Sequence, residues 1–188
     1  MATKTSELLS EAAPRAIAVV RAIRDDQLEL PTPCADYTVR DLLNHLFQVL
    51  VNFQEMAAKR PPNWDKVDYL PEGWRDRFAA EAQRLIEAWA DPAALEGVAP
   101  GMGLPAQVVG EMALIDLTVH AWDLARATGQ PFDAAPAVVA AAHAFMDRMG
   151  DAGQRMGAFA APVEAPPGGT PFDLVLARMG RQPTWSPR

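Results

Sequence analysis

The chain of 188 residues has few of the side chains that crosslink or bind metals, with one cysteine and three histidines. A single cysteine, Cys34, cannot form a disulfide within the chain and cannot build a cysteine-rich zinc site. This usage is typical of proteins from a reducing compartment, so we expect the chain in the cytoplasm. Any metal site would have to rely on the few histidines together with carboxylates.

Excess positive charge and long apolar runs are also missing. The sequence has 17 Lys and Arg against 24 Asp and Glu, with a formal net charge of −7. An acidic chain is a poor match for nucleic acids or anionic membranes, so we expect neither as a partner. No window reaches about 18 apolar residues and the N-terminal segment lacks a signal-peptide core, so we predict no membrane span.

Strand-forming patterns are nearly absent as well. Alternating β-branched runs do not occur, and alanine-rich segments with an apolar period near 3.6 dominate the sequence. The length suits a single domain, 1–188. We predict an all-α, four-helix bundle with a long crossover connection and a short C-terminal helix, 150–188 forming a loop, that helix and a tail. The predicted helices cover residues 5–25, 39–59, 71–90, 105–128, 133–149 and 171–180.

Local signals predict where several of these helices begin and end. Thr38 and Asp41 have the spacing of a capping box, with Asp in the place where Glu is usual. Gly129 is a candidate C-cap for the fourth helix. Asp133 is the expected N-cap of the fifth.

The segment 111–126, EMALIDLTVHAWDLAR, has the character of a buried helix and yet carries Asp116, His120 and Asp123. At about 100° per residue, His120 lies about 40° from Asp116, and Asp123 lies about 20° to the other side. The three share the sector of Val109 and should point into the bundle. Burying unpaired carboxylates costs on the order of several kcal/mol each. A metal ion between helices would offset that cost and could bind an Asp and a His at this spacing.

The most suitable further ligand is His45, in RDLLNHLFQVL on the second predicted helix. Its helix has a strong capping signal, and residues on both sides of it have the pattern of a core. The ordinary alternatives remain open: a lone His on an apolar face is often a satisfied core residue, and Asp116 with His120 may form an i, i+4 ion pair. We expect His143 to be structural or at the surface and Cys34 to be a structural thiol, because no base for it is visible. Packing roles are expected for Trp64, Trp74, Trp89 and Trp122.

Three segments carry a resemblance to a known family. PTPCADYTVRDLLNHL at 31–46, IDLTVHAWDLARATGQP at 115–131 and LARMGRQPTW at 176–185 resemble the mycothiol-dependent maleylpyruvate isomerase N-terminal family. The likeness is greater to the stand-alone metal-binding branch within the DinB-like superfamily. It covers nearly the whole chain in order, and the motifs around His45 and His120 are specific when taken together.

This resemblance implies a DinB-like bundle with one divalent metal ion, zinc in the best-known members and nickel as another possibility. The family pattern of a His and a later acid-x3-His maps onto His45, Asp116 and His120. The isomerases have Glu at the acidic position, whereas this chain has Asp, whose side chain is one methylene shorter. Asp123 matches a family Asp that would orient a ligand His without binding the metal.

The resemblance further implies an enzyme, a thiol S-transferase or isomerase. A metal with three protein ligands keeps one position open, where a small-molecule thiol such as mycothiol would be activated for attack on a small electrophile, for example an unsaturated acid or an epoxide. The isomerases carry a C-terminal substrate domain, for which few residues remain here, so maleylpyruvate isomerisation itself is not carried over. The alternatives are a structural or sensory metal in a binding or homodimerising bundle, and a metal-free bundle with a buried ion pair.

Overall fold

The computed structural model describes residues 4–34 and 36–187. These residues form six α-helices and two 3-10 turns, and the described part of the chain contains no strand, only isolated bridges between Pro31 and Thr38 and between Val98 and Pro105. The all-α prediction is confirmed. None of the described helices is long and apolar enough to span a membrane. The helices are α1 (Thr5–Ala22), α2 (Val39–Ala57), α3 (Trp74–Ala90), α4 (Ala106–Ala127), α5 (Pro136–Arg155) and α6 (Pro171–Arg178).

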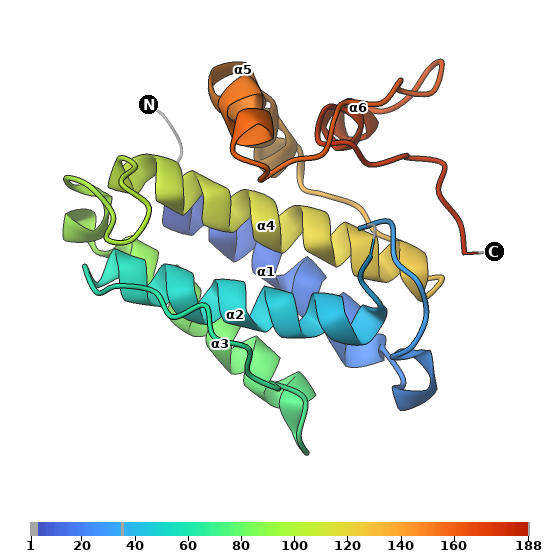
Figure 1. The fold of residues 1–188 in the computed structure, drawn as a ribbon, viewed down its shortest axis with the longest axis horizontal. Helices are drawn as coiled ribbons and strands as arrows, with labels where there is room; N and C mark the ends of the chain where they lie inside the picture. The colour runs from blue at the N-terminus through green and yellow to red at the C-terminus, as the bar shows by residue number, and fades with distance from the viewer. Residues whose placement is uncertain (1–3, 35, 188) are drawn as a thin grey trace.

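Helices α1 to α4 form a DinB-like bundle in which α1 packs against α3 and α4 more than against α2, the next helix in the chain. Both α1 and α2 pack chiefly against α3 and α4 (Figure 1). This order needs long connections, and residues 23–38, 58–73 and 91–105 supply three of them where the sequence predicted one long crossover. The arrangement places α2 beside α4, so side chains far apart in the sequence can meet between them.

A second layer covers the outer side of α4. Figure 1 shows α5 and α6 beyond α4, away from α2 and α3. Apolar side chains of α4 form a second cluster with those of α5 and α6, which explains why α4 is buried on nearly all sides. Its members are Ile115, Val119, Trp122, Ala142, Phe145, Met146, Val175, Leu176 and Met179.

Two of the three predicted capping features agree with the structure. Thr38 and Asp41 form the predicted capping box, with the Asp41 amide donating to Thr38 Oγ1 and the Thr38 amide donating to Asp41 Oδ2. Gly129 follows α4 with a φ of 69°, a left-handed conformation that suits glycine. The prediction for Asp133 was wrong: Ala135 is the N-cap of α5, and Pro136 at its first position sets the start.

Helix α5 also extends past the predicted end at residue 149, to Arg155. Two glycines that suggested a loop, Gly150 and Gly153, are buried inside the helix. A Cβ on Gly153 would collide with the ring of Phe159, so this glycine permits close packing and does not end the helix.

Candidate metal centre

A cavity of about 550 Å³ lies between α2, α4 and two segments of the C-terminal third of the chain. None of the described lining residues comes from α1 or α3, so the cavity is on the flank of the α2–α4 pair. Helix α2 contributes His45, Val49 and Phe53; α4 contributes Met112, Ile115, Asp116 and His120; loops contribute Pro33, Cys34, Asp36, Tyr37, Trp64, Met102, Gly157, Ala158, Phe159, Ala160, Gly180 and Arg181.

The two predicted histidines meet in this cavity. The ring centroids of His45 and His120 are 5.1 Å apart, with the ring planes at 85°. Asp116 lines the same cavity one helical turn before His120. The carboxylate of Asp116 forms no hydrogen bond within the described residues. Three polar side chains from two helices therefore line one cavity.

Asp123 holds the ring of His120 from behind. Nδ1 of His120 lies 3.1 Å from Oδ2 of Asp123, which is completely buried. A carboxylate accepts a proton donated by Nδ1, so the hydrogen bond favours the tautomer in which Nε2 carries the free lone pair. Nε2 is thus the nitrogen of His120 that could bind a metal.

Arg181 completes this group, and the sequence reasoning did not find it. Its Nη2 donates to Asp123 Oδ2 at 3.1 Å and to Cys34 Sγ at 3.6 Å, and its Nη1 donates to the Met179 carbonyl. Arg181 is only 8% exposed although it follows α6 in an irregular segment. Gly180, with a φ of 77°, lets the chain turn just before it. The one available signal was the position of Arg181 within the LARMGRQPTW motif.

Burial shapes the protonation of the candidate ligands. It lowers the pKa of His45 to about 4, and the nearby His120 and Arg181 act in the same direction. It raises the pKa of the Asp116 carboxyl, an effect that His120 and Arg181 only partly oppose. His45 is therefore held as the neutral imidazole that binds metals, while Asp116 lacks enough positive charge nearby. A divalent cation would supply that charge.

Cys34 belongs to the same cavity. Burial raises the pKa of its thiol, and Arg181 opposes the shift. Ligand atoms of Cys34, His120 and Asp123 lie within 4.8 Å of one another, a group that does not include His45 or Asp116. However, the guanidinium of Arg181 already donates to both the thiol and the carboxylate, and it would repel a cation placed among them. We interpret these three residues as a hydrogen-bonded cluster behind the histidines.

The remaining sequence expectations have mixed outcomes. His143 lies outside this cavity, where its Nε2 contacts the Pro171 carbonyl at 2.8 Å, as expected for a structural residue. Trp74, Trp89 and Trp122 are buried. The expectation for Trp64 was wrong: it is 48% exposed and lines the cavity, because it lies in the exposed stretch 63–68 of the connection between α2 and α3.

Fold and site together define the class of the protein: a DinB-like helical bundle with two histidines and a carboxylate in one cavity between α2 and α4. The chain belongs to the mycothiol maleylpyruvate isomerase N-terminal domain family, whose sequence profile matches residues 9–125. The matched range includes His45, Asp116, His120 and Asp123 and ends before Arg181.

Two curated relatives come from Mycobacterium tuberculosis, one from strain CDC 1551 / Oshkosh and one from strain ATCC 25618 / H37Rv, and both are described as uncharacterized. Each is 32% identical over 121 residues, which are 63% of this chain and 64% of the relative. The chain thus matches slightly less than two thirds of the length of these relatives. No solved structure matches the chain significantly.

Proposed function

We propose that His45, Asp116 and His120 bind one divalent metal ion, zinc or nickel, and that the protein uses a low-molecular-weight thiol such as mycothiol in an addition or transfer to a small electrophile. The observation that carries this proposal is the meeting of these three side chains, from α2 and α4, in one cavity. The family to which the chain belongs supports the link to mycothiol.

The residues fit such an ion. Two imidazoles and one carboxylate are a donor set that zinc and nickel accept. The depressed pKa of His45 keeps its lone pair available at neutral pH, and the raised pKa of Asp116 indicates a carboxylate without sufficient counter-charge. The shorter side chain of Asp116, compared with the Glu of the isomerases, still lines the cavity.

The size of the cavity favours a reactive role over a purely structural one. A structural zinc ion usually has four protein ligands in a closed site, whereas three ligands leave one position open. A volume of about 550 Å³ lies within the range of small-molecule pockets. When bound, a divalent ion would lower the pKa of a thiol in the open position and so favour the nucleophilic thiolate.

The chain's own residues prepare this cavity. Asp123 fixes the orientation and tautomer of His120, and Arg181 fixes Asp123. Apolar side chains of α2 and α4, including Val49 and Ile115, form part of the wall. These contacts place the free nitrogen of His120 and the ring of His45 beside the same space before any ligand enters.

Elemental analysis of protein purified without a metal-affinity tag tests the metal site. We expect about one zinc or nickel per chain. His45→Ala should lose it, while His143→Ala, outside the cavity, should keep it. A wild-type protein without metal even after incubation with zinc would contradict the proposal. Metal that survives in His45→Ala but is lost in Cys34→Ser would show that the Cys34 cluster is the binding site.

The thiol is tested separately on cobalt-substituted protein. Mycothiol should produce a sulfur-to-cobalt charge-transfer band in the near ultraviolet, and its oxidised disulfide should not. If saturating thiol leaves the spectrum unchanged in protein that binds metal stoichiometrically, the metal site stands and the thiol assignment fails.

A further inference from the structure

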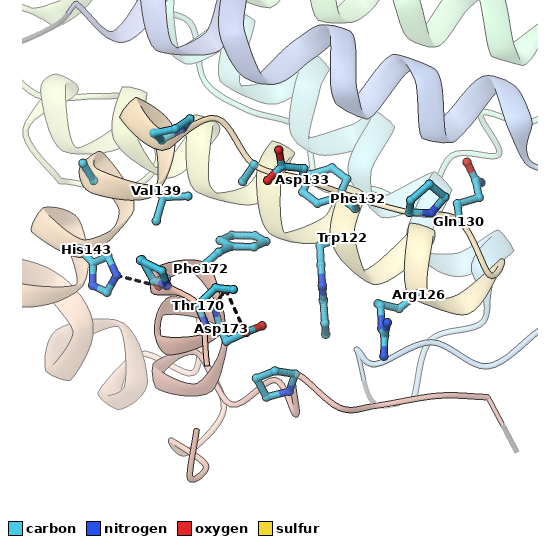
Figure 2. A pocket seen from close by; sticks show the side chains of 16 residues that line it. Trp122, Arg126, Gln130, Phe132, Asp133, Val139, His143, Thr170, Phe172 and Asp173 are labelled. Carbon is cyan, nitrogen blue, oxygen red and sulfur yellow. Dashed lines mark hydrogen bonds between the residues drawn. The ribbon is translucent and has the colours of Figure 1, made fainter. Parts of the chain in front are cut away.

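A second cavity, of about 730 Å³, lies on the other side of α4. It is bounded by the C-terminal half of α4, residues 130–136, α5, the first turn of α6 and Pro183, and we call it the α5–α6 cavity (Figure 2). Trp122, which lines it, is two residues from His120 and so points to nearly the opposite side of the helix. No residue lines both cavities.

The walls of the α5–α6 cavity are aromatic and apolar. Figure 2 shows the indole of Trp122 on one side and the ring of Phe172 on another. Phe132 lies close to Phe172, with 6.1 Å between the ring centroids. Val139 and several prolines add to the apolar surface. A cavity of this size and lining suits an organic molecule with an apolar body and is too large for a lone ion.

Several hydrogen-bond donors around the cavity are already used inside the protein. Nε and Nη2 of Arg126 donate to the Trp185 carbonyl at 3.1 and 2.6 Å. Nε2 of Gln130 donates to two oxygens on neighbouring segments. Nε2 of His143 faces the Pro171 carbonyl, which can only accept, so this nitrogen carries a proton and donates.

Two of the groups left free are carboxylates. Asp133 is exposed and forms no hydrogen bond within the described residues. Asp173 uses Oδ2 for the amide and hydroxyl of Thr170, which leaves its Oδ1 free. Nδ1 of His143 can also accept when the ring is neutral. The two carboxylates outnumber Arg126, whose guanidinium is held against Trp185.

We infer that the α5–α6 cavity binds an organic amine. The protonated nitrogen donates to Asp133, Asp173 adds negative charge to the cavity, and an apolar or aromatic body packs against Trp122 and Phe172. The face of an indole attracts a cation as well as an apolar body, so Trp122 suits both parts of such a molecule. The net charge of −7 also draws cations toward the chain. This site is separate from the metal centre and does not depend on a metal.

Calorimetry with three matched probes tests the inference. 2-Phenylethylamine, 2-phenylethanol and phenylacetate share one aromatic body and differ in the charge of the polar end. We expect binding of the amine, at least tenfold weaker binding of the alcohol and none of the carboxylate. Equal or tighter binding of phenylacetate would overturn the inference, and so would failure of both 2-phenylethylamine and tryptamine to bind at about 10 mM.

One variant and a matched control test where the amine nitrogen of the ligand binds. Asp133→Asn keeps the size of the side chain and disturbs no internal hydrogen bond, and it should weaken amine binding about tenfold while leaving thermal stability unchanged. Asp151→Asn, an exposed carboxylate of α5 outside the cavity, is the matched control and should bind like the wild type. Wild-type affinity in Asp133→Asn would overturn the assignment, as would amide NMR shifts that centre on His45 and His120 in place of residues 130–143 and 170–173.

Discussion

Arg181 donates a hydrogen bond to the same oxygen of Asp123 that contacts Nδ1 of His120, with 3.1 Å in each case. One buried carboxylate oxygen thus joins the C-terminal segment to the imidazole in the cavity. Arg181 and Asp123 are 58 residues apart in the sequence. The orientation of His120 consequently depends on the packing of a distant, irregular segment.

Removing the carboxylate that orients His120 should weaken metal binding. For Asp123→Asn we expect a loss of metal affinity of about 10- to 100-fold, because the amide no longer selects the tautomer with a free Nε2. Competition with a chromogenic chelator measures the affinity. Asp151→Asn is the control for the loss of one negative charge. Undiminished affinity in Asp123→Asn would show that Asp123 has no part in the metal site.

Removing only the guanidinium should destabilise the fold. Arg181→Met leaves Asp123 buried without its counter-charge, and we expect a loss of about 3–5 kcal/mol in the free energy of unfolding, measured with urea. Arg181→Met combined with Asp123→Asn should be less destabilised than the sum of the single variants, because no lone charge remains. Additive losses would mean that the two side chains do not stabilise each other.

The capping box of α2 should contribute to stability in a pH-dependent way. The Thr38 side chain and amide donate to Asp41 and lower the pKa of its carboxyl. A lowered folded pKa gives stability that is present above the unfolded pKa and is lost as the pH falls through the folded value. The deficit of Asp41→Asn relative to wild type should therefore be present at pH 7 and shrink toward pH 3, as followed by urea unfolding. Thr38→Ala should cost about 1 kcal/mol at pH 7. A deficit that stays constant with pH would rule out the ionic contribution.

Two helical glycines should respond in opposite ways to alanine. A Cβ on Gly110 would lie 2.9 Å from the buried ring of Trp89, so Gly110→Ala should lose about 1–3 kcal/mol despite its better helix propensity. A Cβ on Gly150 meets only the flexible end of Met146 at 3.3 Å, and Gly150→Ala should be neutral or stabilising by up to about 1 kcal/mol. Thermal unfolding measures both. Equal stability of the two variants would contradict the close contact between Gly110 and the Trp89 ring.

Much of the fold follows from local sequence patterns. Apolar spacing predicted every helix, and the Thr38 capping box fixed the start of α2, because such signals act within one or two turns. The start of α5 was mispredicted because Pro136 at the first helical position prevailed over the cap expected at Asp133. Its end was mispredicted because Gly153 serves packing against Phe159, a contact that no local pattern reveals.

The candidate site, too, could be predicted only in part from local sequence patterns. Asp116, His120 and Asp123 could be grouped from helical periodicity, since they share a helix. The choice of His45 rested on the capping signal of its helix and on its core-like neighbours, whereas the packing of α2 beside α4 is a tertiary feature that periodicity does not reveal. The contact of Arg181 with Asp123 was not predicted, because it depends on the turn at Gly180 and on the packing of α6, and both are tertiary features.

The late position of Arg181 also has a consequence for synthesis. As the chain leaves the ribosome, helices α1 to α4 emerge first and bring His45, Asp116 and His120 with them. The carboxylate of Asp123 has no Arg181 guanidinium beside it until the segment after α6 has also emerged. An incomplete nascent chain thus carries every proposed metal ligand without the counter-charge of Asp123, which arrives only when the segment after α6 has emerged.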